Sequence, residues 1–413
     1  MFGRRARLIL ATVLVALLGF STPANADTYR SSEWWIGGLG VTKAWKTATG
    51  KGITIAIIDG GVDGSHPDLT GQVIGGTDMS GVGSSDGETP VPPNKRHGTQ
   101  VASLVAGHGD NGNGVMGTAP DAKLLSISVS FSSGTTSGDE QVAKALTWAV
   151  NHGADIVVMS FVMGRSWWTP AWDEAFLKAE KAGVLIVAAA GNRGSGTLSI
   201  GAPASIPGVL AVGGISRSRV VSSFASTKGS TIGVVAPSEK LPGSIPGGGR
   251  VKWNGTSGAA PIVAGIAALV MEAHPELDTI NVINRILVSA DPVGKVGNVN
   301  YGWGVIDADE AVNGDIPTVT VNPLGTLAAW IPLHRYEEWA STVVELPLPG
   351  ELPLPDDRSV SVGLWWADLG VPGIVLGGIA LSVAILVYGI VRRLPRKAKV
   401  ESDSALPVDR VDL

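Results

Sequence analysis

Five short apolar runs, rich in β-branched residues, recur between residues 52 and 216. Glycine-containing or polar stretches separate them. Runs of this length that are apolar throughout are typical of strands buried on both faces of a parallel sheet. The predicted strands are residues 52–59, 124–130, 154–161, 183–191 and 208–216.

Two amphipathic segments lie between these predicted strands. Residues 138–153 and 169–183 repeat apolar positions at helical spacing, carry acidic residues early and end with glycine, as helices commonly do. Alternation of strands and helices predicts an α/β domain with a doubly wound, mostly parallel sheet flanked by helices. Because ligands bind such sheets at the carboxyl ends of the strands, we expect functional residues where strands end.

Longer apolar segments lie near both ends of the chain. Residues 1–26 combine a basic start, an apolar stretch and small residues, which predicts a signal peptide cleaved before Asp27; an uncleaved anchor is the alternative. Residues 371–391 are uncharged and long enough to span a bilayer as a helix. The basic tail, residues 392–413, then predicts a cytoplasmic C-terminus. A buried core helix would not explain that basic flank.

The region before the predicted membrane span is rich in proline. Residues 314–370 include the near-repeat LPLPGELPLP and show little periodicity. Proline-rich segments stay extended. We therefore expect a semi-rigid stalk there, with the globular domain occupying residues 27–313.

Composition excludes several classes of function. The chain has no cysteine, which excludes disulfides and thiolate metal sites. Its net charge is -5, and no basic stripe precedes the C-terminal tail. Nucleic acid is therefore a poor candidate partner.

The stretch NGTSGAAP, residues 254–261, places Ser257 among small residues. This pattern fits either close packing of a helix on a sheet or a nucleophile that other groups must reach. A serine nucleophile needs a base, usually histidine, which a third group orients. Among six histidines, His97 is the best candidate, because it opens a run of small and apolar residues. Capping or loop packing is the alternative role for each histidine.

Two predicted strands run directly into polar residues. The strand at residues 52–59 ends in the carboxylate of Asp59, and the strand at residues 183–191 is followed by Asn192. An amide placed at a strand end can donate to a developing oxyanion, although a simple turn is equally compatible with Asn192. The sequence after Asp59 lacks the glycine spacing of a dinucleotide-binding fold.

The motifs that contain Asp59, His97, Asn192 and Ser257 follow one another in this order along the chain. With this order, residues 45–311 resemble the subtilisin family of serine endopeptidases. The resemblance implies that Ser257 attacks a peptide carbonyl, that His97 transfers its proton and that Asp59 orients His97. It also implies that Asn192 stabilises the oxyanion.

The order of segments is similar to that of the mycosins, the membrane-anchored, subtilisin-like proteases of type VII secretion in actinobacteria. That likeness implies a membrane location, an extracytoplasmic catalytic domain and partners in the secretion apparatus. The cysteines usual in mycosins are missing.

The chain departs from the subtilisin pattern near its motifs. Gly60 replaces a common hydroxyl residue, so we expect weaker support for Asp59, whereas Gln100 replaces a non-catalytic histidine. Gly258 replaces a larger side chain, which predicts a less filled turn after Ser257.

The substrate-pairing segment reads Ser160-Phe161-Val162 instead of Ser-Leu-Gly. The bulk of Val162 predicts a narrow cleft and restricted substrates. Nearby tryptophans that are candidates for walls of this cleft are Trp167, Trp168 and Trp172, although we expect at least one of them to pack beneath the helix instead.

The resemblance implies no required cofactor. Residues 109–117 lie where many subtilisins have a calcium loop, and Asp110, Asn111 and Asn113 offer oxygen ligands. A surface turn has the same composition. Three functions remain open. The first is a membrane-anchored endopeptidase acting on a protein or peptide substrate, and the second is a structural component of a membrane secretion complex in which proteolysis is secondary or absent. The third, which only Gly60 supports, is a degenerate hydrolase that binds peptides without cutting them.

Overall fold

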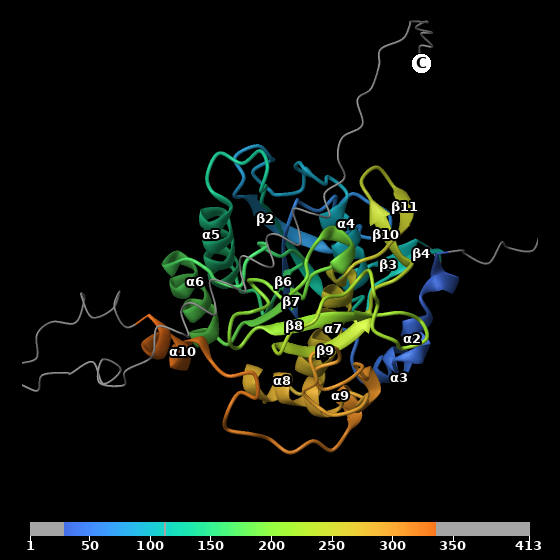
Figure 1. Ribbon diagram of the computed structural model, residues 1–413. Helices are drawn as coiled ribbons and strands as arrows, with labels where there is room; N and C mark the ends of the chain where they lie inside the picture. Colours follow the sequence, from blue (N-terminus) through green and yellow to red (C-terminus); the bar gives the residue numbers. More distant parts are fainter. Residues whose placement is uncertain (1–28, 111–112, 336–413) are drawn as a thin grey trace, which may run out of the picture. The chain divides into compact units, whose positions relative to one another are not determined.

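The five predicted strands lie side by side in one seven-stranded sheet (Figure 1). The computed structural model describes residues 29–110 and 113–335. The strands in question are β1 (Thr54–Asp59), β5 (Lys123–Ser128), β6 (Ile156–Met159), β7 (Leu185–Ala189) and β8 (Leu210–Ile215). The edges are β2 (Val73–Asp78) and β9 (Ile232–Pro237), in the order β2-β5-β1-β6-β7-β8-β9. All neighbouring pairs are parallel, which confirms the predicted type of sheet.

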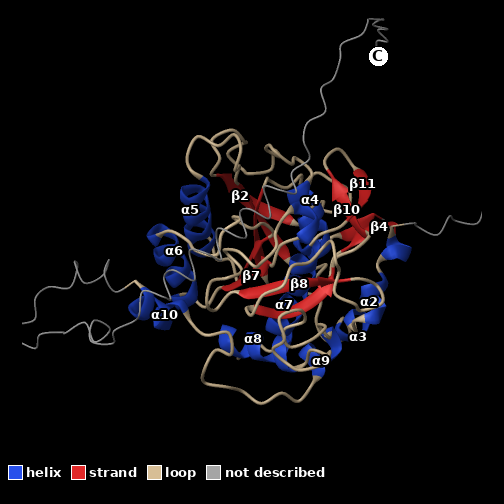
Figure 2. Ribbon diagram, viewed as in Figure 1, coloured by secondary structure: helices blue, strands red, loops and turns tan. Residues whose placement is uncertain are grey.

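Helices cover both faces of this sheet (Figure 2). One face packs on α4 (His97–Ala106), α7 (Thr256–Ala273), α8 (Thr279–Val288) and α9 (Ala308–Asn313). The other face packs on α5 (Gly138–Asn151), α6 (Pro170–Lys181) and α10 (Leu327–His334). The remaining elements are η1 (Arg30–Ser32), α2 (Trp34–Gly38), α3 (Val41–Ala44), η2 (Arg193–Ser195), the hairpin β3 (His108–Asp110) with β4 (Asn113–Met116), and the hairpin β10 (Leu241–Ile245) with β11 (Gly249–Trp253).

Strand β1 shows why the predicted strands are apolar throughout. Ile55 and Ile57 belong to the core on the α7 face, whereas Ala56 and Ile58 belong to the core on the α5 face. Successive side chains of a strand point to opposite faces. A strand with helices on both sides must therefore be apolar at every position.

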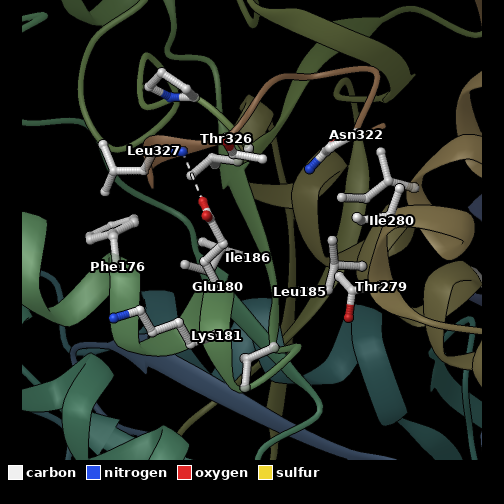
Figure 3. Close-up of a pocket in the computed structure, with 15 residues that line it drawn as sticks. Phe176, Glu180, Lys181, Leu185, Ile186, Thr279, Ile280, Asn322, Thr326 and Leu327 are labelled. Atoms are coloured by element: carbon white, nitrogen blue, oxygen red, sulfur yellow. Dashed lines mark hydrogen bonds between the residues drawn. The ribbon is translucent and has the colours of Figure 1, made fainter. Parts of the chain in front are cut away.

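The segment after α9 differs from the predicted stalk. Val319 N donates to Asn281 Oδ1 at 2.7 Å, and Asn284 Nδ2 donates to the carbonyl of Pro317 at 2.9 Å. Leu327 N donates to Glu180 at 2.8 Å, beside a pocket of about 290 Å³ at the amino ends of β7 and β8 (Figure 3). Leu327 is buried. Residues 314–335 therefore pack on α6 and α8 as part of the same unit, and the boundary predicted at residue 313 is too early.

Several predicted segments lie outside the described residues. They are the signal peptide (1–26), the rest of the stalk, the membrane span (371–391) and the tail (392–413). Within the described ranges, α7 alone has the length and hydropathy of a membrane-crossing helix, and 78% of that apolar stretch is buried inside the domain. It is a core helix of the α/β unit.

Candidate active site

Asp59 and His97 form the best-defined pair of the site. Asp59 ends β1, and His97 is the first residue of α4. The Nδ1 atom of His97 lies 2.9 Å from Oδ1 and 2.8 Å from Oδ2 of Asp59. The two elements approach closely because residue 98 is glycine: a Cβ there would lie 2.2 Å from the carbonyl oxygen of Gly61. Gly98 thus permits the contact between the helix and the strand-end turn.

The surroundings of His97 favour its charged form. Burial alone lowers the pKa of His97, but the charge of Asp59 and the hydrogen bond to it outweigh burial, so the pKa is raised. The other five histidines, His66, His108, His152, His274 and His334, each have a ring nitrogen within hydrogen-bond distance of a backbone carbonyl. His66 and His274 also lie near a carboxylate, at 3.7 Å from Asp68 and 3.6 Å from Glu276, but these distances exceed those of the two His97–Asp59 hydrogen bonds.

Ser257 lies in the first turn of α7, beside the end of β6. Its hydroxyl donates to the carbonyl oxygen of Ser160 at 2.9 Å. Ser160 lines the same cleft as Asp59 and His97, so the predicted nucleophile lies at the edge of that cleft. Among the residues that the structure describes, no hydrogen bond joins Ser257 Oγ to His97. Rotation of the serine side chain would be needed before His97 could accept its proton.

Asn192 lies beside the start of α7 with its amide fixed in one orientation. Its Oδ1 accepts from Thr256 N at 2.8 Å and from Thr256 Oγ1 at 3.1 Å. Its Nδ2 therefore remains available, and it lies against Gly255, where a Cβ would be 3.3 Å from Nδ2 and 3.6 Å from Ser257 N. Both nitrogen atoms thus lie near the space beside Gly255, which a side chain would crowd. This arrangement suits an oxyanion.

The cleft beside the Asp59–His97 pair has a volume of about 210 Å³. Its walls include Val91, Pro92 and Phe131, together with Ser160 and Phe161 of the predicted substrate-pairing segment. The rings of Phe131 and Phe161 lie 5.0 Å apart. Val162 is half-buried, and its predicted effect on substrate choice remains a prediction.

The three tryptophans that follow Val162 have different environments. Trp168 and Trp172 are buried in the core under α6, where their indole N–H groups donate to Asp173 and to the carbonyl of Asp139. Trp167 is 60% exposed and lies under the guanidinium of Arg165 at 4.2 Å. Two of the three candidate cleft walls are therefore core residues.

The departures from the subtilisin pattern have different structural outcomes. Asp59 accepts from Gly60 N at 2.7 Å, and within the described ranges no hydroxyl group donates to it. Gln100 is buried. The expectation of a poorly filled turn at Gly258 is wrong: a Cβ there would lie 2.2 Å from Leu241 Cδ1 and 3.2 Å from Trp253 Cζ2.

The predicted calcium loop is only partly described. Asp110 ends β3 and Asn113 begins β4, whereas Asn111 lies outside the described residues. In the part of the chain that the structure covers, no group of three or more histidine, aspartate or glutamate side chains is arranged to hold a metal ion. Calcium binding at residues 109–117 remains a prediction.

The fold and the arrangement of the site are those of the subtilisin-like class of proteins. Residues 50–304, more than half of the chain, match the model of the subtilase family, peptidase S8. The chain therefore belongs to the subtilase family, as its sequence motifs predict.

Relatives of known name agree with this assignment. Subtilisin E of Bacillus subtilis is 37% identical over 266 residues, which cover 64% of this chain and 66% of that protein, just under two thirds of its length. Subtilisin of Bacillus pumilus is 36% identical over 266 residues, and the match covers 64% of this chain and 92% of that protein. The solved structure of MycP1 from the ESX-1 type VII secretion system has a TM-score of 0.61 and 28% identity, covering 70% of this chain and 88% of that one. The predicted likeness to mycosins is thus confirmed.

Trp253 is not among the residues predicted from the sequence. This residue lies four positions before Ser257 and adjoins the motif from which that serine was predicted. In the structure its indole ring contacts the imidazole of His97. The position of Trp253 next to the Ser257 motif was the one sign in the sequence that it could belong to the site. The direction of its side chain depends on the β10–β11 hairpin, which was not predicted.

Proposed function

We propose that the protein is a serine endopeptidase that cleaves peptide bonds by nucleophilic catalysis. The observation that carries the proposal is the Asp59–His97 pair, which shares one cleft with the carbonyl that binds the Ser257 hydroxyl. Three groups in these positions form the nucleophile, base and orienting acid that acyl transfer requires.

Each residue has a defined role in this reaction. Ser257 Oγ rotates from the Ser160 carbonyl and attacks the peptide carbonyl while His97 Nε2 accepts its proton. Asp59 holds Nδ1 of His97 protonated and stabilises the imidazolium. Asn192 Nδ2 and Ser257 N donate to the oxyanion. His97 then protonates the leaving amine, and water, activated by the same base, hydrolyses the acyl-enzyme.

We further propose restricted substrate specificity. The support is the narrow cleft beside His97, closed on one side by the Phe131–Phe161 ring pair. The bulk of Val162 acts in the same direction. A substrate with small or apolar side chains fits the apolar walls formed by Val91, Phe131 and Phe161 better than one with charged side chains, because these three side chains offer no polar partner.

We also propose a location outside the cytoplasm, with a single membrane anchor and a link to protein secretion. The support is the order of predicted segments at residues 1–26 and 371–413, together with the similarity to MycP1, whose own description places it in a type VII secretion system. In this arrangement the catalytic domain faces away from the cytoplasm and the short basic tail lies inside.

Labelling with a fluorophosphonate probe tests the enzymatic proposal. The wild-type chain should be labelled, because Ser257 is activated by His97, and Ser257→Ala should not be labelled. Wild-type protein that is folded but unlabelled would contradict the proposal. Peptides that accumulate around the Ser257→Ala protein would identify the substrate.

The structural role is the second candidate, and MycP1's place in a secretion system favours testing it. In a deletion strain, secretion restored by Ser257→Ala but not by a chain lacking residues 372–413 would favour a structural component. Secretion that requires Ser257 would favour proteolysis as the needed function.

A further inference from the structure

Trp253 is the last residue of β11 and lies beside the strand partner Leu241 of β10. Its indole N–H points to the carbonyl of Pro242 at 3.4 Å, a long hydrogen bond. The ring also lies against the backbone of Gly243, where a Cβ would be 2.6 Å from Nε1. A glycine at position 243 therefore makes room for the indole on the hairpin.

The same hairpin is fixed to the helix that carries His97. Ser244 N donates to Ser103 Oγ at 3.1 Å, and a Cβ at Gly243 would lie 3.1 Å from Cβ and Cγ of Gln100. Ser103 and Gln100 both belong to α4 and are buried. The position of Trp253 is thus coupled to α4 through buried contacts at the base of the hairpin.

The indole reaches both halves of the active site. The ring centroids of Trp253 and His97 lie 5.6 Å apart, with an interplanar angle of 75°, a favourable edge-to-face geometry. On its other side, Trp253 Cζ2 lies 3.2 Å from the position of a Cβ at Gly258, the residue after Ser257. A Cβ at position 258 would meet Leu241 Cδ1 first, at 2.2 Å, and would also be in tight contact with the indole.

We propose that Trp253 is a positioning residue for His97, and that Gly258 is its structural counterpart. Trp253 limits the orientations of the imidazole, so that Nδ1 stays on Asp59 and Nε2 faces the cleft. Glycine at position 258 leaves the volume that the indole needs. The inference rests on the proposed function, because it assigns Trp253 a role in the reaction of Ser257.

A purely structural role is the competing explanation, because Trp253 is half-buried and packs on the core. The two roles differ in what they predict. A positioning residue changes kcat and acts only through His97. A packing residue changes stability or KM, and its effect persists when His97 is removed.

The test compares Trp253→Ala and Trp253→Phe in the full chain. We expect kcat of Trp253→Ala on a peptide ester to fall by about tenfold to a hundredfold, since displacement of a catalytic group by about 1 Å has effects of that order. KM should stay nearly unchanged. Trp253→Phe should recover most of the loss, because it retains an aromatic ring beside His97.

Trp148→Ala is the matched control. Trp148 also stacks on a histidine, His152, at 3.7 Å, but on α5 and away from the cleft. The kcat of the Trp148→Ala variant should equal that of the wild type. A loss in Trp148→Ala as large as that in Trp253→Ala would overturn the proposal.

A double-mutant cycle with His97→Ala separates positioning from packing. Groups that act as one unit are non-additive, so Trp253→Ala should cause no further loss of residual hydrolysis in the His97→Ala background. A further loss there, or an unchanged kcat in Trp253→Ala, would overturn the proposal. If Trp253→Ala does not fold, Trp253→Phe must show a smaller loss with the same non-additivity.

Fluorophosphonate labelling distinguishes the two levels of inference. If the wild type is labelled and Trp253→Ala is labelled more slowly, the result supports both the proposed function and the positioning role of Trp253. Equal labelling rates for the two would overturn the role of Trp253 alone. A folded wild type that is not labelled would overturn the proposed function and the positioning role with it.

Discussion

The hydroxyl groups of Ser257 and Ser160 each donate to the other residue's backbone carbonyl oxygen, and both distances are 2.9 Å. This reciprocal pair joins the first turn of α7 to the end of β6. It holds the predicted nucleophile through the same segment that is predicted to pair with substrate. Ser160 is therefore a support for Ser257 as well as a candidate substrate contact.

Ser160→Ala should weaken the start of α7. Loss of the Ser160 hydroxyl removes one hydrogen bond to α7, which is worth about 1 kcal/mol of unfolding free energy, and kcat should fall because the backbone of Ser257 is less constrained. Thr118→Val is the control, because Thr118 Oγ1 donates to Ile262 of the same helix at 3.0 Å, farther along it. Equal kcat losses in both variants would contradict a local effect on Ser257. Denaturant unfolding and steady-state kinetics measure the two quantities.

The raised pKa of His97 predicts where activity declines on acidification. The base must be neutral, so kcat/KM should fall at a higher pH than for an ordinary imidazole, whose pKa is about 6.5. Asp59→Asn removes the causes that raise this pKa, so the inflection should move to lower pH. Its kcat should fall by about 10⁴-fold, because the imidazole tautomer is no longer fixed.

Asp155→Asn provides the control for that profile. Asp155 accepts from Thr54 N at 2.8 Å at the amino end of β1, the end opposite Asp59. It should leave the acid limb of kcat/KM in place, and a shift as large as that of Asp59→Asn would contradict the assignment of the limb to His97.

The same raised pKa has a consequence for stability. Folded protein binds a proton on His97 more tightly than unfolded protein does, so the stabilisation is fully present below the unfolded pKa. It is lost as the pH rises through the folded pKa. The difference in unfolding free energy between wild type and His97→Ala should therefore be constant below about pH 6.5 and shrink as the pH rises from there through the raised pKa of the folded state.

Asn192→Asp separates the two functions of the Asn192 side chain. A carboxylate still accepts from Thr256 N and Oγ1, so the melting temperature should change little. It cannot donate to an oxyanion, so kcat should fall by at least about 10²-fold, a magnitude known from loss of this donor in a subtilisin. An equal kcat for Asn192→Asp and wild type would rule out the oxyanion role.

Arg335→Ala tests whether the domain extends to residue 335. Arg335 pairs with the buried carboxylate of Asp173 and donates to the carbonyl of Trp168 at 2.8 Å. Removing this cation should cost about 3 kcal/mol of unfolding free energy. Lys144→Ala, which breaks the exposed pair with Glu140, should cost less than about 1 kcal/mol. Similar costs for both would contradict a closely packed C-terminal segment.

The site residues that lie at or just after the end of a strand could be predicted from the sequence. Asp59 and Asn192 each come after an apolar run, and the parallel sheet brings these ends to one edge. His97 and Ser257 were found as candidates, but their assembly also depends on Gly98, whose missing side chain lets α4 approach Gly61. That close approach is a backbone contact between distant segments, which no local pattern reports.

Two features lay beyond local patterns. Residues 314–335 have the proline content of an extended spacer, yet side chains of Asn281 and Asn284 bind their backbone. Gly258 indicated an empty turn, because the side chains that fill the space, Leu241 of β10 and Trp253 of β11, come from other elements. In both cases composition described the segment and tertiary contacts decided its structure.

The attachment of residues 314–335 also determines how the domain would bear mechanical load. A force applied to the chain beyond residue 335 acts first on the Arg335–Asp173 pair and on the Glu180–Leu327 hydrogen bond. These contacts belong to α6, on the face of the sheet opposite α7. Tension therefore enters the domain through α6, on the opposite side of the sheet from the helix that carries Ser257, before it reaches the contacts of residues 317–319 with α8.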